Sequence, residues 1–430
     1  MERTEMQTQS FWKVGHWPTL MAAFLYFDVS FMVWVLLGPL APAITQHLHM
    51  NATQKGLLVA LPLLGGAFFR PILGALCDRF GGRRIGLLGL TLTLVPLFWG
   101  WRYAAQPWHF YALGFLLGIA GASFAVALPL ASKWYPSEYQ GRVMGIAGAG
   151  NSGTLLATLF APRLAKHFGW ANTFVLAALP VLCVLVLFAL LAKDSPTPRK
   201  AIAWKEYKKI LSEPDTLWMC LLYSLTFGGF VGLASFLTLF FHDQYHLSAV
   251  RAGDFTTLVV FAGSYLRPVG GWLSDKLGGY RLLIGIFLSV GICMGVMGRL
   301  PAFPLATALL FVVMSLLGMG NGAVFQLVPL RFPAIVGVIT GLVGAAGGIG
   351  GFFLPSTLGM FKDRAGSYGA GFDFYAVLFF LAAPLLLELG RKWHASWREE
   401  VVAQAGIFSY RNPVERERPS FAETAEAVAE

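Results

Sequence analysis

Twelve long hydrophobic segments, separated by short polar stretches, dominate the pattern of this sequence. Each is long enough to cross the roughly 30 Å hydrocarbon core of a bilayer, which takes about 20 helical residues. The runs are continuous rather than alternating, which favours helices over the strands of a membrane barrel. The chain is 56% hydrophobic and 13% charged, whereas a soluble domain is about 25% charged. We therefore expect an all-α membrane protein with twelve transmembrane helices, spanning about residues 18–44, 54–76, 84–104, 107–132, 142–166, 171–193, 214–241, 251–274, 280–300, 302–330, 333–361 and 370–391.

Basic residues are distributed unequally between the two sides of the predicted membrane. An even number of spans places both termini on one side; 22 of the 32 lysines and arginines fall on that side and 8 on the other. Loops rich in Lys and Arg face the cytoplasm. The sequence therefore predicts a multi-pass protein of the cell (inner) membrane, embedded in the lipid bilayer, with both termini cytoplasmic. Because this topology accounts for the net charge of +10, we do not expect nucleic acid as a partner.

The longest charged stretch between spans, residues 194–213, divides the chain into two sets of six spans. We expect an N-terminal half at 1–193, a cytoplasmic linker at 194–213, a C-terminal half at 214–391 and a polar cytoplasmic tail at 392–430, disordered beyond Trp397. Within the linker, residues 202–211 form either a short helix on the membrane surface or a solvated connection, and both readings stay open.

An internal repeat gives each half one arginine inside an apolar run. One copy occupies residues 70–84 and the other 267–281, so that matched positions lie 197 apart. Each copy begins with an arginine followed by proline and has an aspartate eight residues later. The two aspartates, Asp78 and Asp275, are expected to have structural or gating roles, because they can cap a helix end or pair with basic residues across the seam between the halves.

The repeated arginines, Arg70 and Arg267, are predicted to lie deep in the membrane. Eight residues correspond to about 12 Å of helix, so Arg70 lies near the middle of its span. An arginine facing lipid at that depth costs at least about 2.5–3.5 kcal/mol. Acids are scarce in the spans, with Asp28 the deepest. We therefore expect the two arginines to converge on a site for an anion, the alternative being that each pairs with a buried acid or with backbone carbonyls.

Two glycine-rich runs accompany the arginines, at residues 145–153 in the fifth span and 341–352 in the eleventh. Their spacing is typical of close helix packing, for which Gly148, Gly344 and Gly348 are well placed. Glycine also lets the backbone approach a small ligand closely. We expect Gly150 and Gly347 to lie beside the ligand pathway or at a tight helix crossing.

These motifs resemble those of a known family. Gly74-x-x-x-Asp78-Arg79-x-Gly81-Gly82-Arg83-Arg84 and the paired six-span halves resemble the major facilitator superfamily. The run from Ala147 to Gly153 and the run from Gly341 to Pro355 resemble the two signatures of its nitrate/nitrite porter family. The resemblance covers all twelve spans.

The resemblance implies a set of substrate-binding residues. Arg70 and Arg267 match the arginines that clamp the anion in that family, and Asn151 matches the signature asparagine. The matching aromatic residues are Phe124, Tyr223 and Phe227. Nitrate and nitrite are small, flat and singly charged, which suits planar guanidinium groups with paired donors and an aromatic sandwich. From the residues alone, ordinary core packing is the simpler interpretation of the three aromatic side chains.

The function that follows is transport of nitrate and/or nitrite by alternating access, with proton-coupled uptake of nitrate as the first hypothesis. Asp28 is the candidate proton-carrying residue, because a carboxylate near two arginines would link anion and proton binding. A structural hydrogen-bonding role for Asp28 is the alternative. Other functions left open are nitrate/nitrite exchange, transport of another small anion and a membrane nitrate sensor.

The sequence carries no pattern that indicates an enzyme or a cofactor. There is no nucleophile elbow, no phosphate-binding loop and no metal-ligand spacing. His242 and His246 form an isolated pair near a span end, which is more typical of solvated side chains than of metal ligands.

Overall fold

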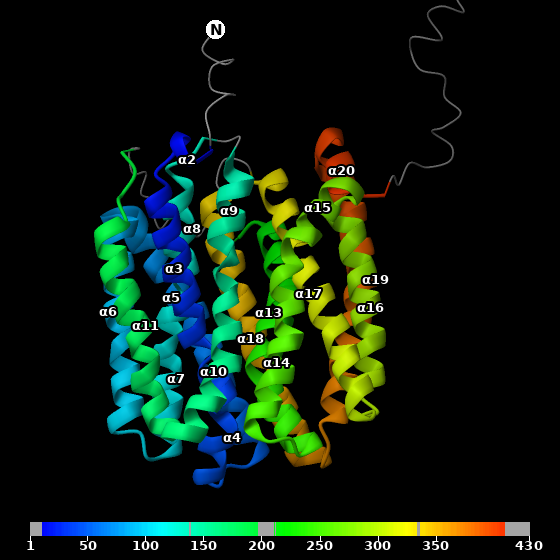
Figure 1. The fold of residues 1–430 in the computed structure, drawn as a ribbon. Helices are drawn as coiled ribbons and strands as arrows, with labels where there is room; N and C mark the ends of the chain where they lie inside the picture. The colour runs from blue at the N-terminus through cyan, green and yellow to red at the C-terminus, as the bar shows by residue number, and fades with distance from the viewer. Residues whose placement is uncertain (1–10, 137–138, 197–209, 211, 333–335, 409–430) are drawn as a thin grey trace, which may run out of the picture.

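The computed structural model describes residues 11–136, 139–196, 210, 212–332 and 336–408, and these residues form a bundle of long, nearly parallel helices (Figure 1). The N-terminal half contains α2 (Phe11–Val14), α3 (Trp17–Trp34), α4 (Leu37–His47), α5 (Ala52–Phe80), α6 (Gly82–Arg102), α7 (Pro107–Gly121), α8 (Phe124–Ser132), α9 (Gln140–Gly148), the 3-10 turn η2 (Ala149–Ser152), α10 (Gly153–Phe168) and α11 (Trp170–Leu191). The C-terminal half contains α13 (Pro214–Tyr245), α14 (Ala249–Tyr265), α15 (Arg267–Leu277), α16 (Gly279–Met297), α17 (Phe303–Arg331), α18 (Val336–Ala365), α19 (Gly369–Ser396) and α20 (Glu399–Ala405).

Eleven helical stretches of the described chain are long and apolar enough to cross a membrane. They correspond to eleven of the twelve predicted spans. The remaining one, predicted at 251–274, divides at Leu266 into α14 and α15. Pro268 has no N–H to donate to the carbonyl four residues earlier, which weakens the helix at this point.

Several other spans are interrupted near their middle. Helix α3 gives way to α4 after Trp34, α7 gives way to α8 before Phe124, and α9 passes through η2 into α10 at Asn151. Irregular backbone at membrane depth is tolerated where protein or a polar cavity surrounds it. The breaks therefore place Trp34, Phe124, Asn151 and Arg267 at points where helices change course inside the bundle.

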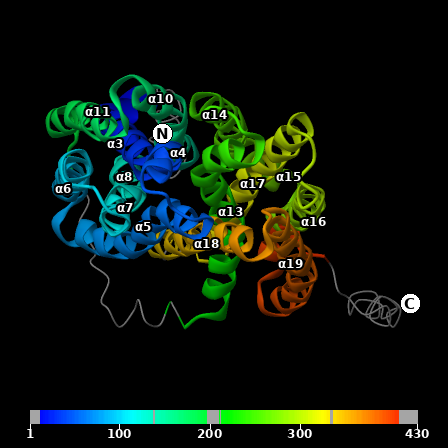
Figure 2. The same cartoon turned by 90° about the horizontal axis from the view of Figure 1, so that it is seen from below.

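The two halves stand side by side, as the end-on view in Figure 2 shows. Across the seam α5 packs on α18, α10 on α14 and α4 on α13. Glycines permit the close approach of α5 and α18: a Cβ added to Gly56 would lie 2.4 Å from the Pro355 carbonyl oxygen, and one added to Gly359 would lie 2.3 Å from that of Ala52. The seam is therefore formed by pairs of helices that lie far apart along the sequence.

The beginning of the predicted tail is ordered, contrary to expectation. Helix α19 continues to Ser396, and the short helix α20 follows with Val402 and Ala405 buried. Gly406, which ends α20 with φ = 71°, lies against Gly278 in the second copy of the repeat. The rest of the tail (409–430) and almost all of the linker segment at 202–211 lie outside the described residues.

Asp215 fastens the end of the C-terminal half that carries this tail. Its carboxylate accepts hydrogen bonds from Trp393 Nε1 at 2.8 Å and Trp397 Nε1 at 3.0 Å, and it pairs with Arg331. Because the carboxylate is buried, these donors replace the water that it loses. The ends of α13, α17 and α19 are thereby held together.

Candidate functional site

Arg70 is completely buried in the middle of α5, with 1% of its surface exposed. Its Nε donates to the carbonyl of Gly121 at 3.0 Å, and Nη1 donates to the carbonyl of Gly344 in the other half. The second terminal nitrogen, Nη2, is buried without a partner among the described residues. A buried donor that lacks a partner is unfavourable, so this nitrogen could still donate to an acceptor placed beside it.

Three aromatic rings surround the Arg70 guanidinium. Its Cζ lies 5.0 Å from the ring centroid of Trp34, 5.4 Å from that of Phe227 and 5.7 Å from that of Phe124. A ring face attracts a cation without cancelling its charge. The site is consequently walled by rings and remains positive.

Arg267, at the start of α15, faces the same place from the second half. Its Cζ lies 5.3 Å from the Phe325 ring centroid, and its buried Nη1 has no partner among the described residues. Tyr223 hydrogen-bonds with Arg267 and lies close enough to Arg70 to interact with its charge. The two arginines are also close enough to repel each other. Two cations held this close are stabilised by an anion placed between them.

The aromatic residues form one connected group. The rings of Tyr223 and Phe227 are stacked at 5.0 Å with an interplanar angle of 3°. Phe325 meets Tyr223 edge-on at 4.9 Å and lies 6.4 Å from Phe124. Six helices supply these rings and the two arginines: α3, α5, α8, α13, α15 and α17.

The glycines of the eleventh span lie where the site needs space. A Cβ on Gly347 would lie 2.7 Å from a ring carbon of Tyr223 and 2.8 Å from one of Phe227, distances that real side chains do not reach. A Cβ on Gly344 would lie 3.4 Å from Phe124 and 3.8 Å from Arg70, whereas a Cβ on Gly348 would lie 3.0 Å from that of Ala67. Gly344 and Gly347 therefore lie against the aromatic rings of the site, whereas Gly348 lies at a packing contact between α18 and α5.

The glycines of the fifth span behave differently. A Cβ on Gly150 would lie 2.5 Å from the ring of Phe27, which in turn packs 5.7 Å from Phe124. Gly148 has nothing within 4 Å of its Cβ position. The packing role expected for Gly148 is therefore wrong in this structure, while Gly150 does lie at a tight contact.

Asn151 and Asp28 lie beside this contact. Asn151, in η2, is 3% exposed, and its Oδ1 has no partner among the described residues. Asp28 Oδ1 accepts from Ser152 Oγ at 2.6 Å, and the carboxylate also accepts from the backbone N–H of Gly153, the first residue of α10. Asp28 thus caps a helix of a neighbouring span, and among the described residues no acidic side chain forms an ion pair with Arg70 or Arg267.

Two of the aromatic residues beside the arginines, Trp34 and Phe325, were not predicted from the sequence. Phe325 had a signal in the sequence, because Gly322-Ala323-Val324-Phe325 repeats the pattern of Gly121-Ala122-Ser123-Phe124 in the other half. Trp34 had a weaker signal: membrane tryptophans gather at the interfaces, whereas this one lies near the middle of its span.

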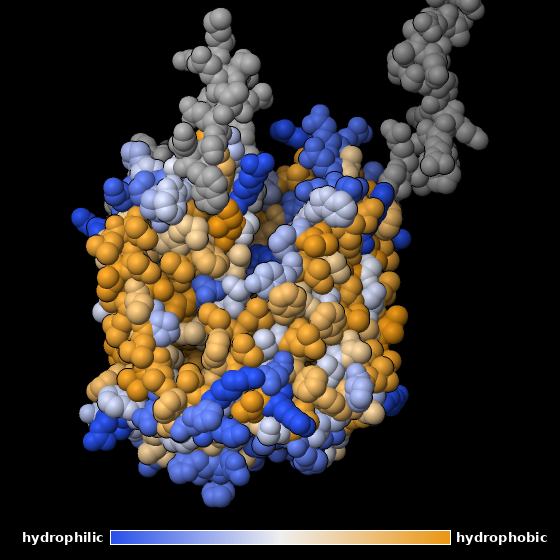
Figure 3. All heavy atoms as spheres, viewed as in Figure 1, coloured by the Kyte–Doolittle hydropathy of each residue, from blue (hydrophilic) through white to orange (hydrophobic). Residues whose placement is uncertain are grey.

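The site is sealed from the end of the bundle opposite the termini. Lys55 pairs with Asp243 at 2.7 Å and Arg163 with Asp254 at 2.6 Å, in each case across the seam. Asp363 of α18 accepts from the backbone N–H of Ala52 at 3.1 Å and of Thr53 at 2.7 Å, and so caps α5 of the other half. Figure 3 shows hydrophilic residues gathered at this end and an indentation between the halves at the end that carries the chain termini.

The aspartates of the repeat do not bridge the halves in this state. Asp78 pairs at 3.4 Å with Lys133 of its own half. Asp275 is exposed and has no ion-pair partner among the described residues. All cross-seam ion pairs of the described chain lie at the opposite, sealed end.

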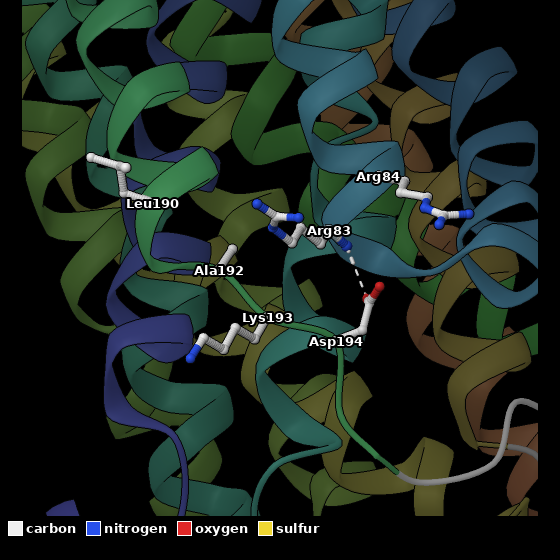
Figure 4. Close-up of a pocket in the computed structure, with 6 residues that line it drawn as sticks. All are labelled: Arg83, Arg84, Leu190, Ala192, Lys193 and Asp194. Atoms are coloured by element: carbon white, nitrogen blue, oxygen red, sulfur yellow. Dashed lines mark hydrogen bonds between the residues drawn. The ribbon is translucent and has the colours of Figure 1, made fainter.

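A second recess lies where α6 begins and α11 ends, on the side of the bundle that carries the chain termini (Figure 4). It is lined by Arg83, Arg84 and Lys193, together with Asp194. Arg83 donates to the carbonyl of Ala189 at 2.8 Å, and its backbone N–H donates to Asp194. The basic side chains point in different directions in Figure 4. This recess is therefore separate from the buried arginine site and does not form a convergent anion site.

The fold and the site together define a class of protein: a polytopic membrane transporter with two halves around a central cationic site. The family model described as Major Facilitator Superfamily matches residues 22–355. The chain is 36% identical over 344 residues to the "Nitrite extrusion protein" of Bacillus subtilis, covering 80% of this chain and 87% of that protein. It is 34% identical over 342 residues to the "Probable nitrate/nitrite transporter NarK2" of Mycobacterium tuberculosis, covering 78% and 86%.

Among solved structures, the fold is similar to a partially occluded inward-open conformation of the xylose transporter XylE from E. coli. The TM-score is 0.70 at 16% identity, over 86% of this chain and 98% of that one. The chain belongs to the major facilitator superfamily and, within it, to the nitrate/nitrite porter family.

Proposed function

We propose that this protein transports nitrate and nitrite across the cell (inner) membrane by alternating access. The observation that carries the proposal is the site itself. Two arginines from opposite halves lie among aromatic rings, close enough for their charges to interact, and no acid of the described chain forms an ion pair with either. The terminal end, which carries most of the basic residues, faces the cytoplasm. The ion pairs across the seam then lie at the outer end, and Arg70, Tyr223 and Phe227 are buried within the bundle.

The geometry favours a small, flat, singly charged anion. Nη2 of Arg70 and Nη1 of Arg267 each supply a donor, and the rings of Trp34, Phe124 and Phe227 lie close around the Arg70 guanidinium and leave little room beside it. A tetrahedral oxyanion of similar charge needs more height than a flat one. Binding an anion reduces the repulsion between the two guanidinium groups, so the loaded protein moves between its two open states more readily than the empty one.

Anion flux in proteoliposomes tests this proposal. The purified protein should take up labelled nitrate and nitrite, and excess unlabelled nitrate should compete strongly. Sulfate and phosphate at the same concentration should compete weakly. Transport of another small anion would be indicated instead if chloride or a carboxylate competed as well as nitrate, and protein-free liposomes measure the leak.

The mode of coupling depends on Asp28. Proton-coupled uptake requires its carboxylate to titrate during the cycle, whereas its contacts with Ser152 and Gly153 favour a helix-capping role. Exchange of nitrate for nitrite is therefore the second candidate. A site carrying two positive charges and no acid moves more easily when an anion occupies it in both directions.

We expect Asp28→Asn to keep exchange of nitrate between the two faces and to lose uptake driven by an imposed pH gradient, because asparagine can cap the helix but cannot carry the proton. Ser152→Ala is the control for the hydrogen bond itself: it removes the bond from Ser152 to Asp28, retains the carboxylate and should keep the pH response. Wild-type flux that ignores the pH gradient and requires a counter-anion would identify an exchanger and leave Asp28 a capping residue.

A further inference from the structure

Trp34 is held in position by a hydrogen bond and by close contacts with two other helices. It is completely buried at the end of α3, and its Nε1 donates to the carbonyl of Pro62 in α5 at 2.6 Å. The ring fills space that two glycines leave open: a Cβ on Gly66 would lie 2.8 Å from it, and a Cβ on Gly121 would lie 2.4 Å from it. Contacts with α5 and α7 therefore set the plane of the indole.

The same two helices hold Arg70. Gly121, whose missing side chain makes room for Trp34, also provides the carbonyl that accepts from Arg70 Nε. Gly66 precedes Arg70 by one helical turn on the same side of α5. Of the rings around Arg70, that of Trp34 is the nearest, at 5.0 Å from Cζ. The indole, the Gly121 carbonyl and the guanidinium form one packed unit.

The chemistry of this unit explains why an aromatic residue lies here. A buried guanidinium needs stabilisation, and a carboxylate would supply it by ion pairing. A carboxylate would also neutralise the charge that attracts the substrate. An indole face stabilises the cation and leaves its charge and its remaining nitrogen, Nη2, available.

We propose that Trp34 is a positioning and specificity residue that fixes the plane of the Arg70 guanidinium and thereby selects flat anions. The inference rests on the proposed function and deepens it, since Trp34 acts through Arg70. Loss of the indole lets the guanidinium tilt, which weakens binding of a flat anion and relaxes the discrimination against a pyramidal one.

The test measures nitrate uptake and its inhibition by chlorate, a singly charged pyramidal anion, for Trp34→Leu and Trp34→Phe. Trp34→Leu should raise the KM for nitrate about tenfold with a smaller change in the maximal rate, and chlorate should become a relatively better competitor. Trp34→Phe retains a ring without the N–H and should give an intermediate KM and selectivity, so it carries the test if the leucine variant does not fold.

Trp393→Phe provides the matched control. Trp393 is as buried as Trp34 and also donates an Nε1 hydrogen bond, to Asp215, but lies away from the site. Its replacement should leave the ratio of nitrate to chlorate affinity unchanged. The inference is wrong if folded Trp34 variants keep the wild-type KM and ratio, or lose maximal rate alone. If the wild-type protein moves no nitrate, the proposed function fails and the inference fails with it.

Discussion

Arg70→Lys is expected to lower nitrate flux roughly 10- to 150-fold while the protein still folds and inserts. Arg70 uses Nε and Nη1 to bridge the carbonyls of Gly121 and Gly344 and keeps Nη2 free. A lysine has one nitrogen and no planar face for Trp34, so it cannot reproduce this arrangement. A hydrogen bond to a charged group contributes about 1.5–3 kcal/mol, and about 1.4 kcal/mol corresponds to a factor of ten.

Arg267→Lys should reduce flux by a comparable factor, because Nη1 of Arg267 faces the site and its guanidinium lies over Phe325. Initial rates in proteoliposomes, normalised to folded protein, measure both effects. Arg102→Lys is a suitable control, since Arg102 is exposed at the end of α6. Near-wild-type nitrate transport by both site variants would contradict the role assigned to the guanidinium groups.

Gly347→Ala is expected to reduce transport by at least about tenfold. The added methyl group would lie 2.7–2.9 Å from ring atoms of Tyr223 and Phe227, which forces the stacked rings to move. Overpacking of this kind typically costs about 1–3 kcal/mol, and here the displaced atoms are those of the binding site. Transport rate and melting temperature should be measured on the same preparation.

Gly285→Ala is the matched control for this substitution, because Gly285 has nothing within 4 Å of its Cβ position and lies on an exposed face of α16. It should change neither transport nor melting temperature. If Gly347→Ala lowers the melting temperature and the flux per folded molecule stays at the wild-type level, Gly347 serves helix packing alone.

Helical spans in a lipid bilayer are determined locally, which is why the sequence predicted them well. Hydropathy over about 20 residues decides whether a segment spans the membrane. The repeat offset of 197 residues revealed the two halves and paired Arg70 with Arg267. A charge inside an apolar run is costly wherever the helix packs, so the two arginines could be singled out without knowing their neighbours.

The partners of those arginines were decided by the tertiary structure. In a membrane, both the lipid-facing and the buried sides of a helix are apolar, so the sequence does not reveal how each helix is rotated about its axis. The placement of Trp34 against Arg70 depends on a break after α3 and on two glycines in other helices. The break at Leu266 sets Arg267 at a helix start beside Pro268, whereas the matching pair Arg70-Pro71 leaves α5 unbroken, so the proline alone did not decide where a helix breaks.

Asp28 is a further residue whose partners could not be predicted from the sequence. As the deepest acid in the sequence it was the candidate proton carrier, with a structural hydrogen-bonding role as the alternative, and in the structure it accepts hydrogen bonds from Ser152 and Gly153 at the start of α10. The sequence by itself determined the membrane class, the two halves and the two cations, because each follows from composition or spacing along the chain. Only the packing of helices from both halves decided which rings, carbonyls and caps surround those cations, because such contacts join residues that are distant along the chain.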